Sequence, residues 1–293
     1  MKFFAYQNKK AHDYFEGYYV RIYNETYNYA FIMAVTKYTK DPHAFLQIFN
    51  GKTHENTYIR YDADTFYESS GTIYVGPNRL SIDQLIIDTP KLSLEATLTN
   101  HIVLDKSAMA YLRKLPLECY QEVLMLDGAF KGKLTLDNQA MSLEGKAYME
   151  KTYGKQFPQA WFWIQANDFN QPLAISMAGG DIPLPLTKKT RFGFFVLLWY
   201  KGTLYRFGSF NFAKLTFDQN GAQKLTIKRK KRTLKIELTP AKATLLKGPS
   251  KGGDMILDVY ESLNAQLKVR LYEADELIIE AQSKHVGMEW MHL

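Results

Sequence analysis

The sequence is poor in cysteine, in long apolar runs and in targeting signals. Its single cysteine, Cys119, leaves no pair for an internal disulfide and no set of thiolates for a metal. The longest uncharged apolar run covers nine residues, 192–200, against the roughly 20 that a membrane-spanning helix needs. The first residues, MKFFAYQNKKAHDY, lack the apolar core and cleavage site of a secretory signal. We therefore expect a soluble, cytoplasmic protein.

The sequence also lacks the motifs of metal and nucleotide enzymes. None of its six histidines has a partner at the spacing of a metal site. No GxSxG, GxGxxG or kinase signature is present. We expect no metal and no cofactor.

Aromatic residues are abundant, with 20 tyrosines and 18 phenylalanines, and they favour strands over helices. They occur in short alternating blocks broken by glycine, asparagine, aspartate and proline. In residues 91–98, for example, Leu92, Leu94, Ala96 and Leu98 alternate with polar residues. The pattern predicts about sixteen strands with spacings typical of barrels or sandwiches. We favour barrels, because closure removes exposed edge strands and leaves an interior able to hold a ligand.

One segment departs from the strand pattern. Residues 106–115 (KSAMAYLRKL) have a helical composition and end at Pro116. A short helix or loop here would divide the chain into two comparable halves, 1–120 and 121–293. The predicted fold is therefore all-β, with two antiparallel β-barrel halves packed together and very little helix. Between two later strands, Lys201-Gly202 predicts a two-residue hairpin turn.

Two segments combine aromatic rings with charged and amide side chains. Residues 148–169 read YMEKTYGKQFPQAWFWIQANDF, and residues 14–22 read YFEGYYVRI. Both are too polar to be only core and too aromatic to be only surface. They predict an aromatic-lined cavity with a few charged groups, which suits a largely apolar ligand.

Each segment contains one candidate acid. Glu150 precedes Lys151, and the simpler interpretation is a solvated ion pair at a strand end. If the chain turns Glu150 inward, its carboxyl group could act as a general acid. Glu16 shares a strand face with Tyr18, and it is either buried and hydrogen-bonded or turned outward.

Alternation also places Trp161, Trp163 and Gln165 on one strand face. In a barrel lumen, the two indoles could stabilise a passing carbocation by cation–π attraction. Ordinary core filling is the alternative. Asn167 and Asp168 follow as turn formers.

The chain is basic, with a net charge of +7 and a run KRKKR from Lys228 to Arg232. The run lies at a predicted hairpin tip without the interleaved aromatics of nucleic-acid binders, so we expect no nucleic-acid partner. A solvated turn is the first interpretation. Contact with an anionic membrane surface is the second.

The two aromatic segments resemble the tocopherol cyclase family. FEGYY at residues 15–19 is similar to the family pattern FEGWYF. Residues 148–169 are similar to YxEKxWGxxFPxxWxWxQxNxF. The resemblance implies a lipocalin-like fold of two related β-barrel halves, akin to carotenoid 1,2-hydratases. It also implies an isomerase- or lyase-type reaction without a cofactor. A prenyl double bond is protonated, and a phenol oxygen or water captures the cation.

Roles for individual residues follow from this resemblance. Glu150 or Glu16 would be the catalytic acid, with Tyr153 and Tyr18 as hydrogen-bonding partners. The substrate-binding residues would be Trp161, Trp163, Gln165 and Asn167, of which the tryptophans shield the cation and the amides orient the head group.

The chain departs from the family pattern at two of these positions. Tyr18 and Tyr153 stand where the family has tryptophan, so the substrate can differ. The partner expected is an apolar small molecule, a prenylated quinol or a polyene. The alternative hypothesis is a lipocalin-like carrier of such a molecule, with no chemistry of its own.

Overall fold

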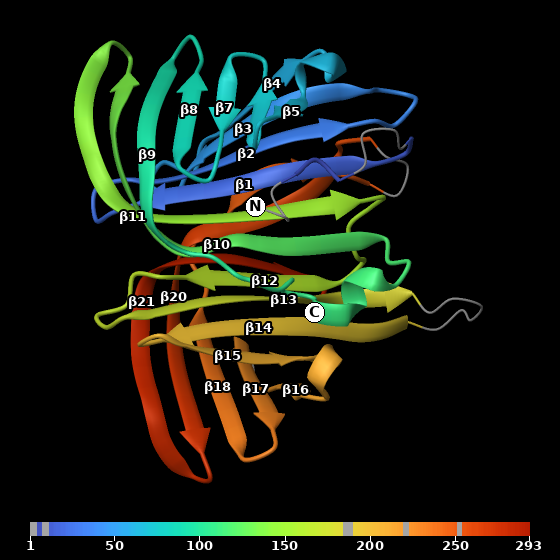
Figure 1. The fold of residues 1–293 in the computed structure, drawn as a ribbon, viewed down its shortest axis with the longest axis vertical. Coiled ribbons are helices and arrows are strands. Elements are labelled where there is room, and N and C mark those ends of the chain that lie inside the picture. Colours follow the sequence, from blue (N-terminus) through green and yellow to red (C-terminus); the bar gives the residue numbers. More distant parts are fainter. Residues whose placement is uncertain (1–4, 8–11, 184–189, 219–222, 251–253) are drawn as a thin grey trace. The chain divides into compact units, whose positions relative to one another are not determined.

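The computed structural model describes residues 5–7, 12–183, 190–218, 223–250 and 254–293. Within these ranges the chain is all-β apart from three short 3₁₀ helices. The strands form an 11-stranded and a 10-stranded antiparallel sheet. Figure 1 draws the strands of both sheets as arrows. The all-β prediction is confirmed. No helix in the described ranges is long and apolar enough to cross a bilayer.

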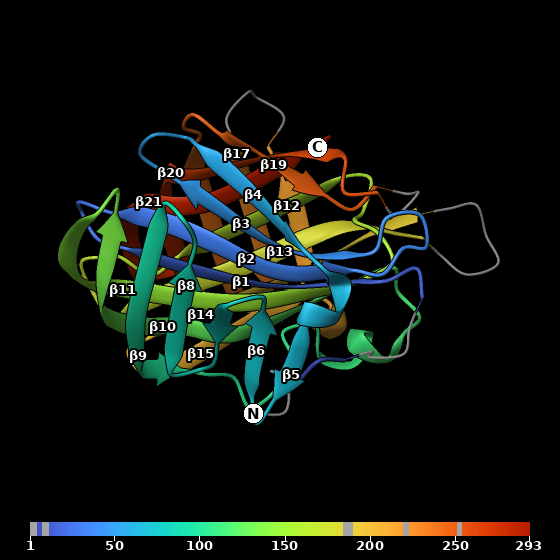
Figure 2. The ribbon, with the colours of Figure 1, turned by 90° about the horizontal axis from the view of Figure 1, so that it is seen from above.

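The first sheet has the strand order β4-β3-β2-β1-β11-β10-β9-β8-β7-β6-β5. Strands β1 to β4 run next to one another in Figure 2. The bounds are β1 (Phe15–Tyr23), β2 (Asn28–Thr36), β3 (His43–Asn50), β4 (Asn56–Tyr61), β5 (Tyr67–Ser69), β6 (Thr72–Val75), β7 (Asn78–Leu80), β8 (Gln84–Asp88), β9 (Leu92–Ile102), β10 (Cys119–Leu136) and β11 (Gln139–Gly154). A 3₁₀ helix, η1 (Ala63–Thr65), precedes β5.

Alternation decides which face of the first sheet is its core. In β9, buried Leu92, Leu94 and Leu98 alternate with exposed residues. These leucines belong to a hydrophobic cluster that also draws residues from β1 to β3 and from β6 to β11. Because both ends of the strand order contribute, the sheet curls around this cluster. We call the face toward the cluster the inner face.

The second sheet has the strand order β15-β14-β13-β12-β21-β20-β18-β17-β16, and β19 pairs with β20. A second hydrophobic cluster lines one face of it, and Phe162 and Ile164 belong to that cluster. The bounds are β12 (Trp161–Ala166), β13 (Leu173–Pro183), β14 (Thr190–Tyr200), β15 (Thr203–Gly208), β16 (Lys214–Phe217), β17 (Gln223–Arg229), β18 (Arg232–Thr239), β19 (Thr244–Gly248), β20 (Leu257–Glu273) and β21 (Glu276–Met291), with a 3₁₀ helix η3 (Ser209–Asn211).

The chain divides into two compact units, each made of several segments. Unit 1 is Met1–Ser107, Glu118–Phe157 and Leu246–Asp258; unit 2 is Ala108–Leu117, Pro158–Leu245 and Val259–Leu293. The boundary predicted after residue 120 does not coincide with this division. The reason is strand pairing: β11 pairs with β1, and β10 pairs with β9, so both strands stay with the N-terminal segment.

The short helix or loop expected over residues 106–115 is present in part as a helix. Only a 3₁₀ helix forms there, η2 (Ala110–Lys114), and Ala110 has a φ of 52°. Ten residues are marginal for an α-helix without a packed face, so composition alone did not determine the local structure.

The β10–β11 hairpin is irregular in its first strand. Strand β10 runs unbroken over 18 residues, although its side chains do not alternate throughout. Bulges at Val123/Met125 and Met125/Gly128 break the alternation of β10 and so hide its continuity in the sequence. Between β10 and β11, Asp137 and Asn138 make a two-residue turn with φ of 48° and 65°.

Candidate functional site

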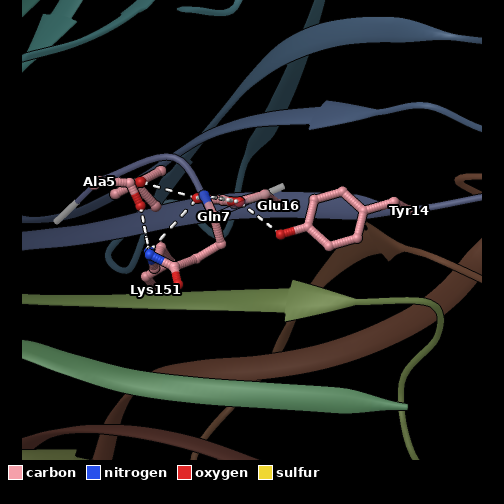
Figure 3. A network of polar contacts seen from close by, with 6 residues as sticks. Ala5, Gln7, Tyr14, Glu16 and Lys151 are labelled. Atoms are coloured by element: carbon pink, nitrogen blue, oxygen red, sulfur yellow. Dashed lines mark hydrogen bonds and ion pairs between the residues drawn. The ribbon is translucent and has the colours of Figure 1, made fainter. Parts of the chain in front are cut away.

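Glu16 lies on the inner face of the first sheet and is fully buried. The hydroxyl of Tyr14 donates to its carboxylate at 2.6 Å, and that of Tyr18 donates at 2.9 Å. The backbone N–H of Gln7 donates at 3.0 Å, as Figure 3 shows. Burial, and then the charge of Glu16, raise the pKa of Tyr14 and of Tyr18 far above that of a free phenol. Both phenols therefore remain protonated donors.

Lys151 brings a buried cation to this carboxylate. Its Nζ lies 3.6 Å from Glu16 Oε1, and both side chains are fully buried. The same Nζ donates to the backbone oxygen of Ala5 at 2.9 Å. It also lies 5.4 Å and 5.2 Å from the ring centroids of Tyr18 and Tyr153. A buried ion pair is stable only when such additional partners satisfy it.

The inner face thus brings together three of the predicted site residues: Glu16, Tyr18 and Tyr153. It does so around Lys151, which the sequence analysis treated only as a neighbour of Glu150. A carboxyl group that accepts from three donors and faces an ammonium group is built as an anion. This geometry suits Glu16 for a counter-ion and not for a proton donor.

Glu150 lies on the opposite face of the same sheet. In β11 it alternates with Lys151, and it stands directly across from Tyr19 in β1. Its side chain is 5% exposed. Gln121 Nε2 donates to Oε1 at 2.8 Å, and the hydroxyl of Tyr148 contacts Oε2 at 2.5 Å. Glu150 is therefore a buried, hydrogen-bonded carboxyl group and not the solvated ion pair that the simpler interpretation predicted.

The predicted partner of Glu150, Tyr153, lies on the other face, across from Glu16 in the ladder. Tyr148 takes that place instead, because residues two apart in a strand share a face. Two more aromatic side chains lie on the same face as Glu150 and Tyr148. Tyr19 lies edge-on to Tyr148 with centroids 6.4 Å apart, and Phe49 lies 6.2 Å from Tyr19. Glu150 is thus a buried acid beside aromatic rings, and two of its contacts, Gln121 and Tyr148, are neutral donors.

Trp161, Trp163 and Gln165 do share one face of β12, but it is not the face toward the hydrophobic cluster of unit 2. Phe162 and Ile164 occupy that face. The predicted barrel lumen lined by tryptophans is therefore wrong. All three side chains are nevertheless buried.

The tryptophan face of β12 has polar partners that the sequence analysis did not identify. Trp161 Nε1 donates to Glu289 Oε2 at 2.6 Å. In the strand ladders, Glu289 stands opposite both Trp163 and Glu261. This places two carboxylate-bearing residues beside the tryptophans, although their spacing in the sequence shows no motif.

Asn167 lies just beyond β12, and its Oδ1 accepts from Gln165 Nε2 at 2.8 Å, so the two predicted amides contact each other. Asp168 accepts from the Ser283 hydroxyl and contacts His285 Nδ1 at 2.7 Å. In the described ranges, no group of three or more His, Cys, Asp or Glu side chains could hold a metal ion.

A surface hollow of about 440 Å³ in unit 1 contains none of the predicted site residues. Its lining is mostly polar: Asp13, Tyr38, Thr39, Lys40, Glu118, Lys155 and Gln156. Its chemistry does not suit an apolar ligand.

Comparison with known proteins gives the family. The model of a family described as tocopherol cyclase-like matches residues 91–290, which is 200 of the 293 residues. The match contains the 148–169 segment and not FEGYY. A protein from Oryza sativa subsp. japonica, described as a probable chloroplastic tocopherol cyclase, is 24% identical over 63% of this chain. The chain spans only 42% of that relative's length.

Two solved structures share the fold at low sequence identity. Kievitone hydratase from Nectria haematococca has a TM-score of 0.51 and 10% identity, covering 94% of this chain and 88% of its own. CghA, solved with Sch210972, has a TM-score of 0.54 and 9% identity, covering 95% and 88%. These likenesses concern the fold alone. The family match spans two thirds of the sequence, and on that ground the chain belongs to the tocopherol cyclase-like family.

Proposed function

We propose that this protein is a cofactor-independent cyclase or hydratase that protonates a carbon–carbon double bond of an apolar, prenylated substrate, with Glu150 as the acid. The observation that carries the proposal is the environment of Glu150. The carboxyl group is buried, neutral groups contact both of its oxygens, and aromatic rings continue its face. Family membership and the activity named for the rice relative support a cyclase reaction.

The proposed reaction balances without an oxidant or a metal. The Glu150 carboxyl proton moves to one alkene carbon, and the cation forms on the other. The faces of Tyr19 and Tyr148 can stabilise that charge. A phenol oxygen or a water then forms the C–O bond. Its proton returns to Glu150, directly or through the Tyr148 hydroxyl, and the net result is ring closure or hydration.

Glu150→Gln tests the assignment, with a prenylated hydroquinone as the assayed substrate. The amide keeps the size of the side chain and one acceptor oxygen but carries no acidic proton. We expect kcat to fall by roughly 10²–10⁴-fold, the usual contribution of a general acid, while substrate binding is retained. Glu144→Gln, an exposed position on the same strand, is the control and should keep full activity.

Three outcomes would decide against this proposal. Unchanged turnover in Glu150→Gln would eliminate Glu150 as the acid. A parallel Glu16→Gln variant that folds and binds but does not turn over would move the role to Glu16. Tight binding without turnover in the unmodified protein would instead support the lipocalin-like carrier.

A further inference from the structure

An N-terminal strap, residues 5–7, lies against the inner face of the first sheet (Figure 3). Two of its polar contacts are with the buried charged groups of this face. The Gln7 N–H donates to Glu16 at 3.0 Å, and the Ala5 oxygen accepts from Lys151 at 2.9 Å. Both contacts use backbone atoms of the strap. Any group that offers one donor and one acceptor at this place could therefore replace them.

The side chain of the strap's middle residue, Tyr6, enters the hydrophobic cluster of unit 1. Its ring lies edge-on to Phe66 with the centroids 5.0 Å apart. The ammonium group of Lys37 lies 5.0 Å from the ring centroid. The ring is 9% exposed, so the inner face contains a space shaped for one phenol ring.

The hydroxyl group of Tyr6 does not match this space. It is buried and makes no hydrogen bond with any residue of the described ranges. The neighbouring phenols differ, since Tyr14 and Tyr18 both donate to Glu16. A buried hydroxyl without a partner destabilises the state that buries it. Tyr6 therefore fits the space by shape and not by polarity.

A free phenol would satisfy the same groups better than the strap does. Its ring would take the place of the Tyr6 ring against Phe66 in the reverse orientation. Its hydroxyl group would point toward the strap backbone, and its para substituent would lie where the Tyr6 hydroxyl group lies. Its hydroxyl would donate to Glu16 in place of the Gln7 N–H and accept from Lys151 in place of the Ala5 oxygen. One hydroxyl can do both because it is a donor and an acceptor, and the carboxylate and ammonium groups lie 3.6 Å apart.

We propose that the inner face of unit 1 contains a second ligand site, which takes a neutral para-substituted phenol and which the strap occupies until such a ligand displaces it. The site lies on the face opposite Glu150 and does not depend on the proposed reaction. The ligand is held there and not turned over, because Glu16 is committed to its ion pair. Strap release would then report phenol binding.

The first test uses the unmodified protein and 4-methylphenol as the probe. The measurement is the hydrogen exchange rate of the Gln7 amide, followed by NMR during a titration. We expect a saturable acceleration of at least about tenfold, since displacement frees this amide from Glu16. Toluene, which lacks the hydroxyl, is the matched control and should have little effect. An unchanged rate, or an equal response to toluene, would overturn the proposal.

The second test removes the internal competitor. In Tyr6→Gly the ring is gone and the backbone contacts remain available. Calorimetry should show 4-methylphenol binding at least about tenfold tighter than in the unmodified protein, and tighter than toluene. Tyr67→Gly, which removes an exposed tyrosine of the same unit, should leave the affinity unchanged.

Equal affinity in Tyr6→Gly and the unmodified protein would contradict competition by the strap. If Tyr6→Gly does not fold, the Gln7 exchange measurement decides alone. Neither readout involves turnover, so failure here is distinguishable from failure of the Glu150 assignment.

Discussion

At the residue scale, the two candidate acids differ in their surroundings and not in their chemistry. Glu16 accepts from Tyr14, Tyr18 and a backbone N–H and pairs with Lys151, all of which stabilise a negative charge. Glu150 contacts Tyr148 and Gln121, and those donors can serve a neutral acid as well as an anion. Two glutamates on opposite faces of one sheet are therefore suited to different tasks.

The hydroxyl groups around Glu16 give a prediction about stability. Tyr14→Phe removes a donor to a buried carboxylate and should lower the free energy of unfolding by about 1–3 kcal/mol. Tyr6→Phe removes a buried hydroxyl without a hydrogen bond and should leave stability equal or higher. Urea unfolding of the two variants measures the difference. Equal losses would show that Tyr6 has a polar partner in solution.

At the element scale, turns and close approaches determine which strands pair. Asp137 and Asn138 both have positive φ, the conformation that a two-residue hairpin requires, and they align β10 with β11. The Lys201-Gly202 turn, with φ of 45° and 86°, has the same geometry and confirms its prediction. The first hairpin matters for the site, because it decides which residues of β10 stand across from β11: Val123 lies opposite Glu150, and Glu122 lies opposite Lys151.

Strand β10 offers a prediction about close packing. A methyl group on Gly132 would meet the backbone oxygen of Glu95 and lie 2.8 Å from Ala96 Cα, in the neighbouring strand β9. Gly132→Ala should therefore cost about 1–3 kcal/mol, since backbone must move. On Gly128 the methyl would meet mainly the flexible end of Met125, so Gly128→Ala should cost clearly less. Thermal unfolding compares the two, and a larger loss in Gly128→Ala would contradict the argument.

At the scale of the whole molecule, basic residues outnumber acidic ones, and some of the basic side chains are paired within the protein. In the KRKKR run, Arg232 pairs with Glu273 at 3.2 Å, and Arg229 donates to the Asn211 oxygen at 3.3 Å. Lys228, Lys230 and Lys231 are exposed at the β17–β18 hairpin. The KRKKR run therefore lies at a hairpin tip, as its sequence predicted. Membrane contact through it stays a prediction.

Replacing Lys228, Lys230 and Lys231 by glutamine tests that contact. The net charge falls from +7 to +4, since three charges are removed. Sedimentation with phosphatidylserine-containing vesicles should lose its salt-dependent part. Glutamine at the exposed positions Lys91, Lys131 and Lys133 gives the same net charge as a control and should preserve binding. Equal loss in both triple variants would show attraction by net charge and not by the hairpin.

Several features of the site could be predicted from alternation. Tyr18 was expected to share a face with Glu16, and Trp161 with Trp163 and Gln165, and each set does. Tyr148 lies two residues from Glu150, so alternation alone could have placed it on the same face as Glu150. Gln121 and Glu289 were not, because only pairing between strands brings them to Glu150 and Trp161.

The sequence by itself determined the all-β class, the family and the set of residues that share each strand face. These are local properties, because side chains alternate along a strand whatever the strand pairs with. Only the tertiary structure decided which face became the core. It turned the tryptophans away from the cluster of unit 2, paired Lys151 with Glu16, and brought Gln121 to Glu150. Burial and charge pairing depend on strands that are distant in the chain, so no local pattern contains them.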